Sequence, residues 1–138
     1  MELTDIHLAA LALTAVVILY TDHVALGYFL GRRRLVSARF SHLSHALIWG
    51  GLFVLIVTGV LLVAPFWEYY RVLPAFYVKM GAVLVLLWNG YAIGRLARVA
   101  SGTPFAELPR ETRRVLLVSG ALSALGWGIA ASVGFLFL

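Results

Sequence analysis

Four long apolar segments, separated by short polar stretches, make up most of this sequence. They cover about residues 6–30, 41–63, 75–100 and 115–138. A membrane-spanning helix needs roughly 20 predominantly apolar residues, and each segment is about that long or longer. None of the segments alternates apolar and polar residues with a period of two, which is the pattern of a half-buried strand. The sequence therefore predicts a single all-α domain, an integral membrane four-helix bundle.

The composition supports this prediction. Of the 138 residues, 62% are hydrophobic and 12% are charged, whereas a soluble domain has about 45–50% apolar and about 25% charged residues. A soluble core of this size could not bury so much apolar surface, so we expect the lipid bilayer to be the solvent. The chain has no cysteine, which excludes disulfides, thiolate metal sites and cysteine nucleophiles.

Arginines are concentrated around two of the three connections between the segments. They are Arg32, Arg33, Arg34 and Arg39, followed by Arg95, Arg98, Arg110, Arg113 and Arg114. Short loops rich in Lys and Arg stay in the cytoplasm. We therefore expect a bacterial cytoplasmic (inner) membrane protein with both termini on the outer side. The same asymmetry accounts for the basic pI of about 10.1, so no nucleic-acid partner is expected.

Small residues recur along the last apolar segment. They form two rows with a small residue at every fourth position. The first row is Gly120, Ala124, Gly128 and Ser132, and the second is Gly126, Ala130 and Gly134. Small residues at this spacing let helix backbones approach closely in lipid. We expect this segment to pack tightly within the bundle, or against a second copy of the chain or another membrane subunit.

Histidines lie near the arginine-rich ends of the first two segments. His42 and His45 are three residues apart and therefore share a helix face. With a rise of about 1.5 Å per residue, His23 lies roughly 10 Å and His45 roughly 6 Å inside that end. Asp22 precedes His23, and ionisable groups within a span are costly and usually functional. We expect His23 and His45 to meet around a common ligand, while His42 lies at the water interface.

Other polar residues have supporting or interfacial roles in this interpretation. Tyr91 and Arg95 reach the level of the histidines from the third segment. Asp22 can orient an imidazole or balance the charge of a metal, or it can pair with Arg95 and fix helix packing. Asn89 is expected to form an interhelical hydrogen bond.

Neutral imidazoles from different helices facing a shared cavity are what an axially ligated haem requires. The same residues can ligate copper, or relay protons, because histidine titrates near neutral pH. Their spacing does not choose among these functions. The sequence has no Gly-rich phosphate loop, no nucleophile elbow and no paired carboxylates, so it leaves open whether the protein is an enzyme.

A family pattern adds two candidates at the opposite end of the spans. It consists of His7, the histidine-bearing start of the second segment, and the run Ala75-Phe-Tyr-Val-Lys-Met-Gly-Ala-Val-Leu-Val-Leu-Leu. The pattern resembles that of small bacterial membrane proteins of the copper-resistance D and HemJ-like protoporphyrinogen oxidase group. The resemblance implies b-type haem or copper handling, with His7 matching the early histidine of that group and Lys79 its lysine. The first segment lacks the Trp and the Gly-Leu-Phe-Tyr-Leu-Pro run of HemJ-like proteins, which favours haem binding over the oxidase activity.

The sequence thus predicts a membrane redox or electron-transfer protein that binds haem b. The candidate cofactor-binding residues are His23, His45, His42, His7 and Lys79, with His23 and His45 as ligands of haem iron or copper. The alternatives are a copper- or other metal-handling protein, a proton-coupled transport protein, and a non-catalytic scaffold subunit of a larger membrane complex.

Overall fold

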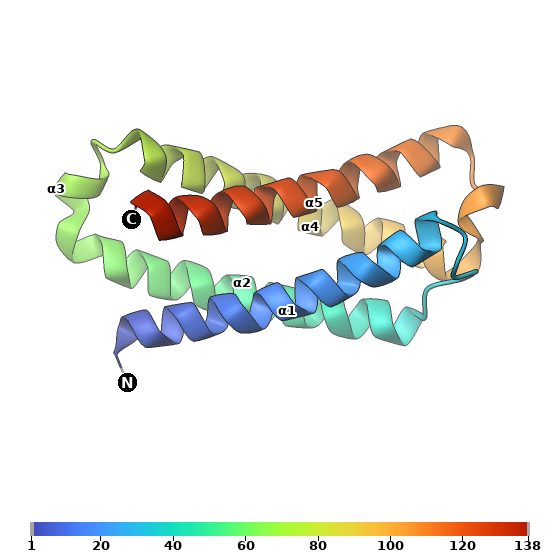
Figure 1. Ribbon diagram of the computed structural model, residues 1–138, viewed down its shortest axis with the longest axis horizontal. Coiled ribbons are helices and arrows are strands. Elements are labelled where there is room, and N and C mark those ends of the chain that lie inside the picture. The colour runs from blue at the N-terminus through green and yellow to red at the C-terminus, as the bar shows by residue number, and fades with distance from the viewer. Residues whose placement is uncertain (1, 138) are drawn as a thin grey trace.

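The structure, a computed structural model, describes residues 2–137 as four long helices joined by short turns (Figure 1). The long helices are α1 (Leu3–Phe29), α2 (Ala38–Val63), α4 (Pro74–Gly102) and α5 (Arg110–Phe137). The connections contain η1 (Ala64–Phe66), α3 (Trp67–Tyr70) and η2 (Phe105–Glu107). Four helices are long and apolar enough to cross a membrane, and residues 2–137 contain no strand. These findings confirm an all-α chain with four helices of spanning length.

Capping residues explain where the helices begin. The side chain of Ser37 accepts a hydrogen bond from the backbone N–H of Phe40 at 3.4 Å, so α2 begins at Ala38 and not at the predicted residue 41. A capping box formed by Glu2 and Asp5 precedes the body of α1. Pro74 occupies the first turn of α4, where its missing N–H costs nothing.

The long helices form two antiparallel hairpins. Helix α1 packs along α2 and α4 packs along α5, while fewer contacts join one hairpin to the other. Figure 1 shows both termini at the same end of the molecule and the α1–α2 and α4–α5 connections at the opposite end. The two termini therefore share one side, as predicted. That this is the outer side of a membrane remains a prediction from the arginines.

Glycines allow close contact within each hairpin. A Cβ atom added to Gly51 of α2 would collide with the side chain of Thr14 of α1. A Cβ added to Gly126 of α5 would lie 2.8 Å from Cδ2 of Leu86 of α4. The row that contains Gly126 therefore packs inside the α4–α5 hairpin. Gly128 belongs to the other row and is exposed, and a Cβ added there would meet no atom within 4 Å.

The two hairpins contact each other at the arginine-rich end. Tyr28 of α1 is only 1% exposed and packs with Ala100, Leu108 and Leu116. Its hydroxyl donates a hydrogen bond to the carbonyl oxygen of Thr103 at 2.7 Å. The backbone N–H of Val36, in the connection from α1 to α2, donates to the carbonyl oxygen of Ala100 at 3.1 Å. These contacts hold the helix ends that surround the candidate site.

Candidate functional site

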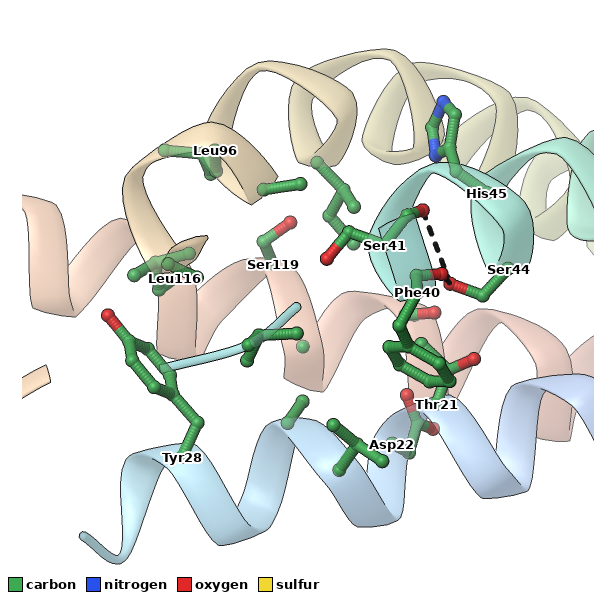
Figure 2. Close-up of a pocket in the computed structure, with 18 of the residues that line it drawn as sticks. Thr21, Asp22, Tyr28, Phe40, Ser41, Ser44, His45, Leu96, Leu116 and Ser119 are labelled. Carbon is green, nitrogen blue, oxygen red and sulfur yellow. Dashed lines mark hydrogen bonds between the residues drawn. The ribbon is translucent and has the colours of Figure 1, made fainter. Parts of the chain in front are cut away.

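A cavity of about 140 Å³ lies between the two hairpins near their arginine-rich end (Figure 2). We call it the inter-hairpin cavity. All four long helices contribute to its walls, which are mostly aliphatic and aromatic. Its polar lining residues are Thr21, Asp22, Ser41, Ser44, His45, Ser119 and Ser123. A mostly apolar cavity with a few polar groups is the usual form of a small-ligand site.

Asp22 and His45 face this cavity from the same depth. Asp22 lies seven residues before Phe29, the last residue of α1, and His45 lies seven residues after Ala38, the first residue of α2. At about 1.5 Å per residue, each lies roughly 10 Å inside its helix end. The earlier start of α2 therefore places His45 deeper than the sequence predicted and level with Asp22.

Asp22 has no hydrogen-bond or ion-pair partner among residues 2–137, and its side chain is half-buried. In that part of the chain the single ion pair joins Arg71 to Glu68, outside the long helices. Arg95 is exposed and forms no ion pair among the described residues, so the expected pairing of Asp22 with Arg95 is not seen. The carboxylate instead faces a mostly apolar space without a countercharge. A charge in such surroundings is costly unless it binds a proton or a cation.

The imidazole of His45 is held by Trp49, one turn further along α2. The indole Nε1 of Trp49 donates a hydrogen bond to Nε2 of His45 at 2.9 Å. Because an indole N–H can only donate, Nε2 must carry the lone pair, and the proton of the neutral ring lies on Nδ1. Nδ1 has no hydrogen-bond partner among the described residues. His45 thus offers an N–H donor while its Nε2 is engaged.

Two glycines of α4 accommodate this pair. A Cβ added to Gly94 would lie 3.1 Å from Nε2 of His45, and one added to Gly90 would lie 3.4 Å from Cζ2 of Trp49. Two residues four apart on α2 therefore pack on two glycines four apart on α4. This contact was not predicted from the sequence, although the Gly-x-x-x-Gly spacing at 90–94 is a known signal for close helix packing in membranes.

His23, His42, Tyr91 and Arg95 do not line the cavity, and all four are exposed. Successive residues of a helix are rotated by about 100°, so when Asp22 faces the cavity, His23 points away from it. The expected meeting of His23 and His45 is therefore not seen. Among the described residues, no group of three or more His, Cys, Asp or Glu side chains could hold a metal ion.

Asn89 forms the interhelical hydrogen bond that the sequence predicted. Its Nδ2 donates to the carbonyl oxygen of Ser119 at 2.8 Å, and the hydroxyl of Ser119 donates to Oδ1 of Asn89 at 2.6 Å. Both residues are buried. This reciprocal pair joins α4 to α5 beside the inter-hairpin cavity.

A second polar cluster lies toward the termini. Nδ1 of His7 lies 2.7 Å from the hydroxyl oxygen of Thr58, and that hydroxyl donates to the carbonyl oxygen of Val54 at 2.7 Å. A hydroxyl has one proton to donate, so Thr58 accepts from Nδ1–H of His7, and Nε2 of His7 retains its lone pair. Lys79 of α4 is half-buried and lies toward the same end of the bundle. A Cβ added to Gly134 of α5 would lie 2.9 Å from Nζ of Lys79.

These positions test the predicted haem ligands. A haem iron needs an imidazole nitrogen with a free lone pair, whereas Nε2 of His45 already accepts from Trp49. The inter-hairpin cavity of about 140 Å³ is also below the ~300–1,000 Å³ of common ligand pockets. His23 and His45 thus do not fit a haem held between them. His7 differs from them, because its Nδ1 is bonded to Thr58 while its Nε2 has no hydrogen-bond partner among the described residues.

No family model, curated protein or solved structure matches this chain. The resemblance to the copper-resistance D and HemJ-like group therefore stays a prediction that rests on His7, Lys79 and the run around Lys79. The fold and the site together describe an all-α protein with four helices of spanning length, arranged as two hairpins around a mostly apolar cavity with a few polar groups.

Proposed function

We propose that this chain is a proton-transport protein of the bacterial cytoplasmic membrane and that protons cross through its working site, the inter-hairpin cavity. The observation that carries the proposal is Asp22, a carboxylate on a helix of spanning length that faces a cavity and has no countercharge among the described residues. Intramembrane carboxylates that face a cavity mark ion pathways and proton relays. Asp22 is the group that binds the proton.

His45 is the second group of the proposed relay. Histidine exchanges protons near neutral pH, and the Nδ1–H of His45 is free of other partners. Ser41 and Ser44 also line the inter-hairpin cavity (Figure 2). A water molecule needs about 10–15 Å³ of such space, so a cavity of about 140 Å³ has room for several. Water molecules and hydroxyls can therefore carry a proton between the two residues.

Protonation of His45 is coupled to packing between the hairpins. A proton on Nε2 would occupy the lone pair that accepts from Trp49, so the 2.9 Å hydrogen bond must break when the ring is charged. The same ring edge packs on Gly94 of the other hairpin. Proton uptake by His45 therefore loosens a contact between the hairpins, which is the coupling that a transport cycle requires.

The test is proton flux into vesicles that contain the purified protein and an internal pH-sensitive dye, driven by a potassium diffusion potential. The wild type should acidify the interior faster than protein-free vesicles do. Asp22→Asn keeps the shape of the side chain but cannot ionise, and it should lower the rate at least tenfold. Glu68→Gln, which changes an exposed carboxylate outside the cavity, is the matched control and should retain the rate. A wild-type rate equal to that of empty vesicles would refute the proposal.

The second candidate is the haem-binding redox function, now placed at His7. It is favoured by the free Nε2 of His7 and by the hydrogen bond that fixes this ring to Thr58, because ligating histidines are commonly oriented through their other nitrogen. His7 would be the residue that holds the haem, and the haem would supply one-electron redox chemistry when bound. Haem-supplemented protein should then show a Soret band that His7→Ala abolishes and His23→Ala retains. Absence of the band in the wild type would exclude this candidate.

A further inference from the structure

A second cavity, of about 50 Å³, lies deeper in the bundle than the first. We call it the deep cavity. Helices α2, α4 and α5 line it, and it shares His45, Ile48, Ile93 and Ser123 with the inter-hairpin cavity. Its other walls include Asn89, Trp49 and Leu86. His45 and Ser123 therefore stand where the two cavities adjoin.

Three of the residues that line the deep cavity have an unused hydrogen-bond donor. Asn89 has two protons on Nδ2, and the hydrogen bond to Ser119 uses one of them. The hydroxyl of Ser123 and Nδ1–H of His45 have no partner among the described residues. In that part of the chain no side-chain nitrogen or oxygen is both fully enclosed and unpaired. Each of these two atoms therefore borders space that a water molecule can reach.

We infer that water molecules occupy the deep cavity and bridge His45, Ser123 and Asn89. A water molecule needs about 10–15 Å³ of such space and two to four polar partners, so a cavity of about 50 Å³ with these donors holds a small water cluster. Since both cavities border His45, the water cluster extends the proposed proton path from Asp22 toward the middle of the bundle. The part that concerns proton transport rests on the proposed function; the hydration of the cavity does not.

The proposed proton path ends at a layer of apolar side chains on the side of the deep cavity away from the arginine-rich end. Leu52 and Leu86 line the deep cavity and are each 5% exposed, and Leu86 lies against Gly126 of α5. Lys79 lies ten residues before Asn89 on α4, which corresponds to roughly 15 Å along the helix. The hydrated segment is therefore a half-channel that adjoins the inter-hairpin cavity and is closed toward the cluster of His7 and Lys79.

Ser123 is the residue that tests this inference, because it lines both cavities and its hydroxyl has no hydrogen-bond partner among the described residues. Ser123→Leu should fill the deep cavity and lower the proton flux of the wild type at least tenfold, and Ser123→Val should lower it by a smaller factor. Ser132→Leu changes an exposed serine of the same helix and should leave the flux unchanged. Circular dichroism and thermal unfolding would establish that each variant is folded.

A second measurement reports hydration without transport. In protein labelled with ¹⁵N-histidine, the Nδ1–H of His45 should show cross-relaxation to water in the wild type and lose it in Ser123→Val and Ser123→Leu. If the wild type shows no water contact at this proton, the inference is wrong. If water contact is present but the wild type carries no proton flux, the hydrated cavity stands and the proposed function fails. If flux is present and both Ser123 variants retain it in full, the path does not run through this cavity.

Discussion

The reciprocal hydrogen bonds of Asn89 and Ser119 allow a quantitative prediction about the α4–α5 hairpin. Asn89→Ala removes both bonds, whereas Ser119→Ala removes only the 2.6 Å bond from the hydroxyl, because the backbone carbonyl still accepts from Nδ2 of Asn89. Interhelical side-chain hydrogen bonds in membrane proteins contribute about 0.6 kcal/mol on average and up to about 1.7 kcal/mol. Asn89→Ala should therefore lower the free energy of unfolding by about 1–2 kcal/mol, and Ser119→Ala by about half as much.

The assay is reversible unfolding in mixed detergent micelles for the two single variants and the double variant. The double-mutant cycle isolates the bond between the hydroxyl of Ser119 and Oδ1 of Asn89, and its coupling energy should be about 0.6–1.7 kcal/mol. Ser132→Ala, at an exposed position of α5, should change stability by less than about 0.5 kcal/mol. A coupling energy indistinguishable from zero, or a larger loss for Ser119→Ala than for Asn89→Ala, would refute the packing described for this hairpin.

Two further predictions concern helix contacts. Gly51→Leu should prevent close packing of α1 on α2, because any side chain at this position meets Thr14. Gly50→Leu next to it should be tolerated, because a Cβ there meets no atom within 4 Å. Thermal unfolding compares the stability of the two variants directly, and equal stability would contradict the contact between Gly51 and Thr14. Tyr28→Phe should lower the free energy of unfolding by about 0.5–1.5 kcal/mol through loss of the 2.7 Å bond to the carbonyl of Thr103, and chemical unfolding that shows no change would contradict it.

The number and type of the long helices could be predicted from the sequence because lipid imposes a simple rule. A span must satisfy its own backbone hydrogen bonds and must be apolar over about 20 residues, and both properties can be read from composition. Helix ends were less predictable. Helix α2 begins at Ala38 because Ser37 is its N-cap, although Ser41 stood nearer to the start of the apolar run.

The candidate site was predictable in depth but not in direction. Counting residues placed Asp22, His23 and His45 at the arginine-rich end, and the structure keeps them there. The count says nothing of which way a side chain faces, so it did not distinguish Asp22, which faces the cavity, from His23, which is exposed. The rotation of α1 decides this, and it is set by the packing of α1 on α2, where Thr14 lies against Gly51; this contact joins two segments that are far apart in the sequence.

The same limit applies to the hydrogen bonds that set the chemistry of the imidazoles. Trp49 occupies Nε2 of His45, whereas Thr58 binds Nδ1 of His7 and leaves its Nε2 free. Both arrangements depend on side-chain rotamers and helix contacts, which the sequence does not specify. Because of these two bonds, we propose a relay role for His45 and give haem binding at His7 as the second candidate function.

Proton flux through Asp22 tests the central claim most directly. Wild-type protein, Asp22→Asn and Glu68→Gln should be reconstituted at equal density in vesicles of the same lipid composition, and the initial rate of internal acidification should be measured for each. The proposal predicts that the wild type and Glu68→Gln acidify at the same rate and that Asp22→Asn is at least tenfold slower. A rate in Asp22→Asn equal to that of the wild type would show that the carboxylate in the inter-hairpin cavity does not carry the proton.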